Sequence, residues 1–220
     1  MPTGMIIIGL TGSIGMGKST AANMLRRLGV PVHDADAEVH GLIGPSGPAV
    51  GAVEHEFPGV TINGAVDRGL LGKRVFGDPA ALKRLEAILH PLVAKGKHKF
   101  LCNCARRGLR AVALDVPLLF ETGGNAKCDA TIVVTASSLL QAQRVLRRPG
   151  MSPQRLIEIQ AQQMSEHEKR RRADFVVPTG LGHNTTLRAL AHIVRLLRFK
   201  RGQHWPAKAY RRKGHARSRT

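Results

Sequence analysis

The sequence is poor in cysteine and in long apolar runs, and it lacks acidic residues in its last part. Its three cysteines, Cys102, Cys104 and Cys128, fit neither a zinc-ligand spacing nor a disulfide framework. No apolar run approaches the roughly 18 residues that a membrane-spanning helix needs. The first four residues, 1–4, lack the charged start of a secretory signal. These absences favour a cytoplasmic protein with no membrane span and with reduced cysteines.

No acidic residue follows Asp174, and the charge is therefore unevenly distributed. The chain of 220 residues carries 34 Lys and Arg against 15 Asp and Glu, a net charge of +19. Eleven of the basic residues lie between Arg188 and Arg219, which leaves a net charge of +8 on residues 1–174. A moderately basic body suits an enzyme whose substrates are polyanions.

A phosphate-binding pattern of the form G-x-x-x-x-G-K-[ST] stands near the start of the chain. Its members are Gly12, Ser13, Ile14, Gly15, Met16, Gly17, Lys18 and Ser19. Glycines let backbone N–H groups turn toward an anion. Lys18 can reach the terminal phosphates of a nucleotide, and the Ser19 hydroxyl can ligate Mg²⁺. An apolar strand over 5–10 and a helix over 19–28 give the strand–loop–helix order in which a helix N-terminus meets phosphate.

Further short apolar segments alternate with helical stretches along the chain. Together with 5–10, the expected strands cover 30–36, 111–115, 130–134 and 174–177. Acidic residues end the second of them, at the sheet edge where ligands of open parallel sheets lie. The pattern predicts an α/β fold of three layers with a parallel five-stranded sheet, as in P-loop NTPases that resemble nucleoside-monophosphate kinases.

Several helices have recognisable ends. Asp78 is expected to cap a helix that has Pro79 in its first turn and an apolar face with Leu82, Leu85 and Leu89. His90-Pro91 is expected to interrupt it, because proline disfavours helix in the residue before. Other helices are expected to begin at Ser137 or Ser138, at Ser152-Pro153, at Ser165 with Glu168 in a capping box, and at Thr185 or Thr186.

The strand–helix alternation is broken once, by a helical insertion over 37–107. This block is the expected acceptor-substrate subdomain. The expected nucleotide-binding core comprises 1–36, 108–143 and 170–199, the lid 144–169, and a basic, disordered tail 200–220.

Motifs that occur in order along 5–195 resemble the dephospho-CoA kinase family. They are Ile8–Thr20, Asp34-Ala35-Asp36, Asp67-Arg68 with Phe76, His90-Pro91-Leu92, Pro117-Leu118-Leu119-Phe120-Glu121, Arg144–Arg148, Gln163 and Ala173-Asp174. Many kinases share the phosphate loop, but the Asp-Ala-Asp and Pro-Leu-Leu-x-Glu segments are more selective. The resemblance implies transfer of the γ-phosphoryl of ATP, with Mg²⁺, to the ribose 3′-hydroxyl of dephospho-CoA, the last step of coenzyme A synthesis.

The resemblance also implies roles for single residues. Asp36 would orient the acceptor hydroxyl and take its proton; the alternative is a helix N-cap. Lys18 and the loop through Thr20 would hold ATP, and Arg144 and Arg148 on the lid would neutralise the transferring phosphoryl. Without the phosphate loop, such an arginine cluster would be interpreted as a solvated helix face.

Four residues are expected on the acceptor side: Asp34, Arg68, His90 and Leu118. Asp34 supports Asp36 by a hydrogen bond or lies near a metal-bound water, and His90 is equally explained as a helix-end histidine. Asp115 is a candidate for the outer shell of the Mg²⁺ site, or a turn residue.

Two parts of the chain depart from the family. Its members commonly have an Asn-containing turn after the last strand, where Thr179 stands here, so the choice of nucleotide base stays open. The basic tail carries Trp205 and Tyr210, and a disordered, solvated extension is favoured over an RNA-binding or membrane-binding arm. Alternative functions are another small-molecule kinase, for a nucleoside or nucleotide, and a nucleic-acid-binding NTPase. The oligomeric state is not predicted.

Overall fold

The computed structural model describes residues 4–205 and divides the chain into two compact units. One unit comprises the residues up to His33 and those from Cys104 onward, and the other is Asp34–Asn103. The first unit holds β1 (Ile6–Thr11), α1 (Lys18–Arg27), β2 (Val32–Asp34, ending at the boundary), β5 (Ala111–Asp115), β6 (Ala130–Thr135), α6 (Ser138–Leu146), α7 (Pro153–Ala161), α8 (Glu166–Arg172), β7 (Phe175–Pro178) and α9 (His183–Leu197). The second holds α2 (Ala35–Ile43), α3 (Val50–Glu56), β3 (Thr61–Ile62), β4 (Ala65–Val66), α4 (Arg68–Val75) and most of α5 (Pro79–Arg106).

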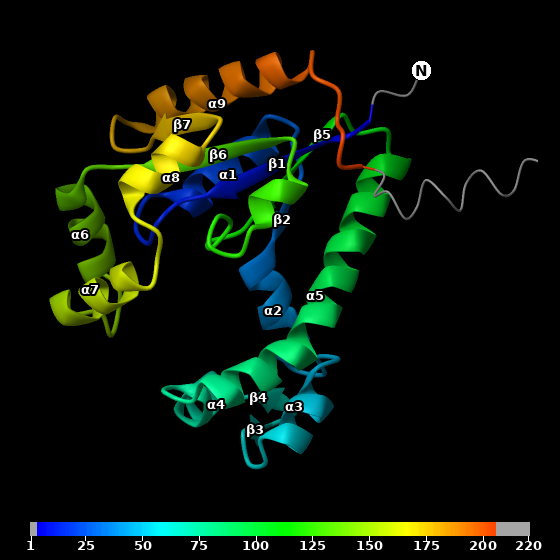
Figure 1. The fold of residues 1–220 in the computed structure, drawn as a ribbon, viewed down its shortest axis with the longest axis vertical. Coiled ribbons are helices and arrows are strands. Elements are labelled where there is room, and N and C mark those ends of the chain that lie inside the picture. Colours follow the sequence, from blue (N-terminus) through cyan, green and yellow to red (C-terminus); the bar gives the residue numbers. More distant parts are fainter. Residues whose placement is uncertain (1–3, 206–220) are drawn as a thin grey trace, which may run out of the picture. The chain divides into compact units, whose positions relative to one another are not determined.

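The first unit is built on a five-stranded parallel sheet in the order β2-β5-β1-β6-β7 (Figure 1). The central strand β1 pairs with β5, where Leu10 stands opposite Asp115, and with β6, where Thr11 stands opposite Val133. The carboxyl ends of β1 and β5 therefore meet at one edge of the sheet. This architecture confirms the predicted α/β fold with a parallel five-stranded sheet.

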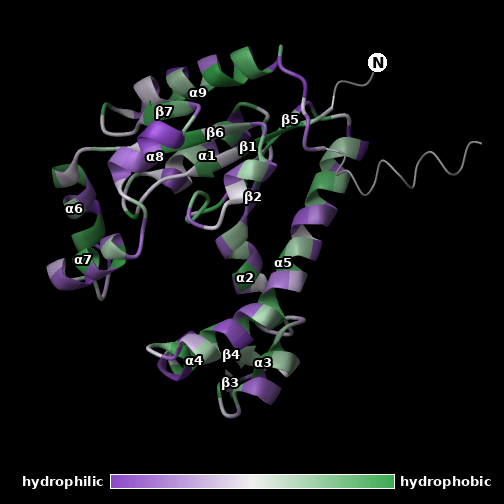
Figure 2. Cartoon of the chain, in the orientation of Figure 1, coloured by the Kyte–Doolittle hydropathy of each residue, from purple (hydrophilic) through white to green (hydrophobic). Residues whose placement is uncertain are grey.

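Side chains of β1 alternate between two buried faces, because successive residues of a strand point to opposite sides. Ile6, Ile8 and Leu10 belong to the core that α1 and α9 complete. On the other face lies Gly9, where an added methyl group would collide with the side chain of Leu119. The apolar strands and the hydrophilic helix α8 are distinct in Figure 2. Helices on both faces give the three predicted layers.

The second unit has its own core and two features that the sequence did not predict. A two-stranded hairpin joins β3 and β4, and α5 runs unbroken from Pro79 to Arg106 with Pro91 inside it. The expectation that His90-Pro91 interrupts this helix is wrong. The apolar face of α5 continues across the proline, and its burial maintains the helix. That face comprises Ala81, Leu85, Ile88, Leu89, Leu92 and Val93.

Most expected helix starts are confirmed, with one exception. The side chains of Ser137, Ser152 and Ser165 accept hydrogen bonds at the starts of α6, α7 and α8. The last helix begins earlier than expected, after Gly182, and Thr186 is no cap. Its hydroxyl donates instead to the carbonyls of Gly182 and Pro178.

Residues 200–205 pack against other parts of the first unit, so the expectation of a disordered tail is wrong for this stretch. Gly202 N–H donates to the Gly4 carbonyl at 3.1 Å, and the Asp129 carboxylate accepts from Gln203 N–H at 2.6 Å. Trp205 is only 7% exposed. The rest of the tail, 206–220 with Tyr210, lies outside the described residues. Within 4–205, no helix is both long enough and apolar enough to cross a bilayer.

Candidate active site

The phosphate-binding pattern forms the predicted loop between β1 and α1. Lys18 is the first residue of α1, and Gly17 before it has φ +86°, a left-handed conformation that favours glycine. A Cβ at Gly17 would lie 2.9 Å from the Thr179 hydroxyl, so a larger residue has no room there. The first N–H groups of a helix have no partner within it and can bind an anion. Ser19 and Thr20, in this first turn, are exposed to solvent.

Lys18 is paired with a carboxylate on the neighbouring strand. Its Nζ lies 2.6 Å from Oδ1 of Asp115, whose side chain is 2% exposed. The pairing follows from the sheet order, because Asp115 ends β5 beside the end of β1. Asp115 is therefore part of the phosphate-binding end of the sheet.

The acidic pair at the end of β2 separates into two roles. Asp34 is the N-cap of α2, and its Oδ1 accepts from the backbone N–H groups of Asp36 and Ala37, both at 3.0 Å. Asp34 thus supports Asp36 through the backbone. The alternative role for Asp36 was the N-cap of a helix, but Asp34 makes this cap instead. The Asp36 carboxylate is exposed.

The lid arginines also differ from one another. Arg144 on α6 donates to both the hydroxyl and the carbonyl of Thr179, at 3.1 and 3.0 Å, and to the Gly15 carbonyl at 3.4 Å. Thr179 in turn donates its hydroxyl proton to the Met16 carbonyl at 2.7 Å. Arg144 therefore braces the phosphate loop from the side of β7. Arg148, beyond the end of α6, is exposed.

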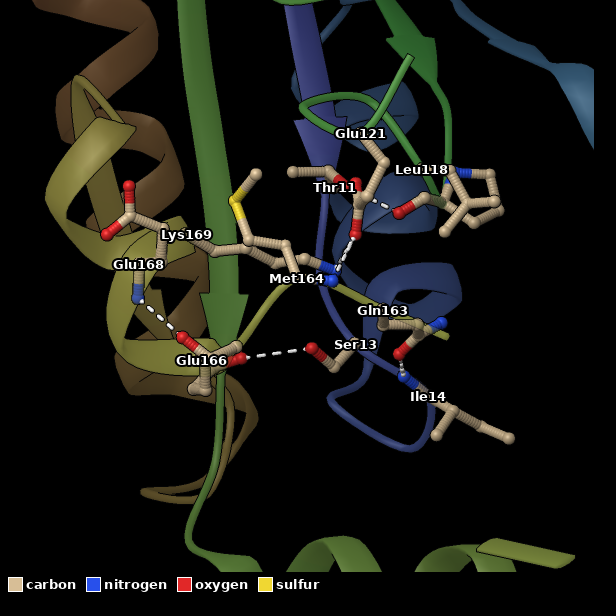
Figure 3. Close-up of polar contacts among 12 residues, drawn as sticks. Thr11, Ser13, Ile14, Leu118, Glu121, Gln163, Met164, Glu166, Glu168 and Lys169 are labelled. Atoms are coloured by element: carbon tan, nitrogen blue, oxygen red, sulfur yellow. Dashed lines mark hydrogen bonds and ion pairs between the residues drawn. The ribbon is translucent and has the colours of Figure 1, made fainter. Parts of the chain in front are cut away.

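The stretch 163–166, which connects α7 to α8 and includes the first residue of α8, is bonded to the start of the phosphate loop (Figure 3). The Ile14 N–H donates to Oε1 of Gln163 at 3.1 Å, and the Ser13 hydroxyl donates to Glu166 at 3.2 Å. Two oxygen-bearing side chains from one short segment thus hold the first half of the loop.

A buried ion pair fixes the same segment from its other side. Lys169 on α8 is fully buried, and its Nζ lies 3.0 Å from Oε1 of Glu121, which also accepts from Met164 N–H (Figure 3). Burial by itself raises the pKa of the Glu121 carboxyl. Hydrogen bonds from backbone N–H groups and from Lys169 outweigh that effect, and the net pKa lies below its usual value.

The residues expected on the acceptor side are dispersed. Arg68 begins α4 and His90 lies within α5, both exposed and both in the Asp34–Asn103 unit. Leu118 follows β5 in the other unit and is 39% exposed. The structure therefore brings together the loop, Lys18, Asp115 and Arg144, while Asp34, Asp36, Arg68 and His90 belong to the second unit.

Sequence reasoning missed the polar residues that support the loop. The sequence presents Thr179 only as a substitute for an asparagine near the base, and Gln163 and Glu121 only as matches to a family. Lys169 stands in the run Glu168-Lys169-Arg170-Arg171-Arg172, which resembles a solvated face. The signal for α8 is the Ser165 cap, which marks the start of the helix but not which of its cations is buried. The Glu168 carboxylate, expected to complete a capping box, pairs with Arg171 and Arg172 instead.

A parallel sheet, a glycine-rich loop that ends in a lysine at a helix N-terminus, and a helical segment bonded to that loop define a P-loop kinase. The chain belongs to the dephospho-CoA kinase family, whose model matches residues 6–182. A dephospho-CoA kinase of Rhodospirillum rubrum is 60% identical over 186 residues, which are 84% of this chain and 88% of that protein. One of Mesorhizobium japonicum is 52% identical over 198 residues, 90% of this chain and 100% of that protein. The crystal structure of TT1252 from Thermus thermophilus is 36% identical, covers 88% of this chain and 97% of its own, and has a TM-score of 0.78.

Proposed function

We propose that this kinase transfers the γ-phosphoryl of ATP to the ribose 3′-hydroxyl of dephospho-CoA, which yields coenzyme A and ADP. The observation that carries the proposal is the phosphate loop with Lys18 and its buried partner Asp115, in a chain that belongs to this family. A loop of this kind stabilises the charge on the phosphoryl group in the transition state of its transfer.

The first unit supplies the groups that hold ATP. The loop from Gly12 to Thr20 would cradle the phosphates, and Lys18 would exchange its contact with Asp115 for the terminal phosphates. Arg144 and Arg148 would neutralise charge as the phosphoryl group moves. Arg144 already lies against the loop, through the Gly15 carbonyl.

Asp36 would act on the acceptor. Its carboxylate would orient the 3′-hydroxyl and take the proton as the hydroxyl oxygen bonds to the γ-phosphorus and the bond to ADP breaks. The Asp34 cap supports this role because it fixes the backbone at Asp36 and leaves the second carboxylate exposed. Arg68, His90, Leu118 and Asp34 itself would contact the acceptor.

The residues at the loop suit Mg²⁺, which takes oxygen ligands and binds through one or two protein groups, the substrate phosphates and several waters. The Ser19 hydroxyl would be a direct ligand, and the Asp115 carboxylate would accept from a metal-bound water. Across residues 4–205, no group of three or more His, Cys, Asp or Glu side chains forms a closed metal cage. When bound, the ion would neutralise charge on the β- and γ-phosphates.

The test is a coupled ADP-release assay with dephospho-CoA, AMP and nucleosides as parallel acceptors, and mass spectrometry of the product. Among these acceptors, we expect only dephospho-CoA to support rapid ADP release, and we expect its product to have gained one phosphate. Faster turnover of AMP or of a nucleoside would refute the acceptor and leave the kinase class intact. RNA-stimulated ATP hydrolysis with no phosphorylated acceptor would refute the transfer reaction itself.

A further inference from the structure

Residues Ser13–Met16 of the phosphate loop form a tight turn. The Met16 N–H donates to the Ser13 carbonyl at 3.1 Å, and Gly15, the third residue, has φ +77°. A positive φ at the third position is the mark of a type II turn. Type I and type II turns differ by a flip of their central peptide, which here consists of the Ile14 carbonyl and the Gly15 N–H. The direction of the Gly15 N–H therefore depends on which way the Ile14 carbonyl points.

Three glutamines on α6, on α7 and directly after α7 hold the backbone at and next to that peptide group. Gln141 on α6 is 4% exposed, and its Nε2 donates to the Ile14 carbonyl at 2.7 Å. Gln160 on α7 donates to Oε1 of Gln141 at 2.9 Å, which fixes the orientation of the Gln141 amide. Gln163 accepts from the Ile14 N–H at 3.1 Å. Both polar groups of Ile14 are thus held by side chains from beyond residue 140.

The turn is also packed against α6. A Cβ at Gly15 would lie 2.6 Å from a methyl group of Val145 and 3.1 Å from the Gln141 carbonyl. Glycine-rich backbone by itself has many accessible conformations. A loop whose N–H groups converge on an anion must therefore be held in place when no anion is bound, and pre-organisation of this kind increases affinity.

We propose that Gln141 is a positioning residue for ATP, which fixes the central peptide of the phosphate-loop turn in its type II orientation. Gln160 acts through Gln141, and Gln163 holds the neighbouring N–H. The proposal rests on the proposed use of ATP and extends it, since it gives α6 and α7 a part in shaping the phosphate loop.

The experiment measures ATP affinity by isothermal titration with a non-hydrolysable ATP analogue, in the absence of acceptor, for Gln141→Leu, Gln160→Leu and the double variant. Gln141→Leu should weaken binding about tenfold, the effect of one lost buried hydrogen bond. Gln160→Leu should weaken it by a smaller factor, roughly threefold. In the double variant Gln160→Leu should add nothing, because its only route to the loop is already removed.

Three comparisons separate positioning from general damage. Gln143→Leu, an exposed position on the same helix, should bind the analogue like the wild type. Gln141→Glu keeps the size of the side chain but loses the donor, and it should bind no better than Gln141→Leu. The KM for dephospho-CoA should stay within about twofold of wild type in every variant, since only the ATP loop is altered.

Several results would overturn the proposal. They are unchanged analogue affinity in a folded Gln141→Leu, full additivity of the two substitutions, and an equal rise of KM for both substrates. Gln160 is exposed, so its variant folds even if Gln141→Leu does not, and unchanged affinity in that variant alone also refutes the proposal. The titration contains no acceptor, so its result does not depend on which acceptor the enzyme uses. A protein that binds the analogue but does not turn over dephospho-CoA would refute the assigned acceptor, and the glutamine variants could still be compared by their affinity for the analogue.

Discussion

Asp34 makes the cap of α2, and this leaves the adjacent carboxylate of Asp36 exposed, with no hydrogen bond to another of the described residues. A carboxylate that makes no such hydrogen bond can accept one from a substrate hydroxyl. Replacement of Asp36 by Asn keeps the shape and removes the base. We expect Asp36→Asn to lower kcat by roughly 10²–10⁴, the range for a general base, with KM for ATP nearly unchanged. Steady-state kinetics test this.

The matched control for that variant is Glu86→Gln, which neutralises an exposed carboxylate of α5 in the same unit. Its kinetic constants should equal those of the wild type. A kcat close to wild type in Asp36→Asn itself would remove Asp36 from the proton transfer, and a raised KM for ATP would assign it to nucleotide binding.

The second prediction at the level of single residues concerns the contribution of the Glu121–Lys169 ion pair to stability. Lys169 is fully buried, so Lys169→Met leaves the partner carboxylate without its cation. Breaking a buried pair in this way costs about 3–5 kcal/mol, whereas the double replacement Glu121→Gln with Lys169→Met should recover much of that loss. Urea unfolding at pH 7 measures both.

The pH dependence of the same pair has a definite sign. The pKa of Glu121 is lower in the folded protein than its ordinary value of 4.5, so its contribution to stability is present above that value. It is lost as the pH falls below 4.5 through the folded pKa. The difference in unfolding free energy between wild type and Glu121→Gln should therefore shrink when urea unfolding is repeated at progressively lower pH. A constant difference would show that the ion pair contributes nothing.

At the scale of elements, α5 offers a test of how a helix survives an internal proline. Pro91 has no N–H and its ring obstructs the carbonyl one turn earlier, so the helix continues at a cost. Pro91→Ala should raise the free energy of unfolding by about 2 kcal/mol, a part of the proline penalty. Pro79→Ala, at the first position of the same helix where no N–H is needed, should change it little. Urea unfolding measures the free energy of unfolding of both variants. A lower value for Pro91→Ala than for the wild type would show that the fold requires the proline.

The elements also explain which features the sequence could predict. The β1–loop–α1 segment and the serine caps were predicted because their signals lie within a few neighbouring residues. The contacts that fix the loop were not, because Gln141 and Ile14 are 127 positions apart and Thr179 and Met16 are 163 apart. Local rules also failed at Thr186, whose hydroxyl bonds backwards to the carbonyl four residues earlier and so cannot cap.

At the scale of the whole molecule, the segment 200–205, which follows α9, is bonded to the residues around the start of β1. The Asp129 carboxylate binds Ile7 N–H through one oxygen, at 2.8 Å, and through the other it binds Gln203 N–H and the ring of His204. Its side chain is 4% exposed. Removal of the segment would therefore leave a buried carboxylate oxygen without its donors and remove the buried side chain of Trp205 from the fold.

Truncation tests this link and locates the boundary between fold and tail. A chain that ends at Phe199 should lose about 3 kcal/mol or more, the usual effect of removing a buried aromatic side chain, and should unfold roughly 6–12 °C lower. A chain that ends at Trp205 retains every contact described and should unfold at the temperature of the full-length protein. Below their unfolding temperatures both chains should keep the kcat of the full chain, because the segment lies at the opposite end of β1 from the phosphate loop. Equal thermal stability of the two truncated chains would show that residues 200–205 add nothing to the fold, and a loss of kcat in the shorter one would connect this end of the sheet to phosphoryl transfer.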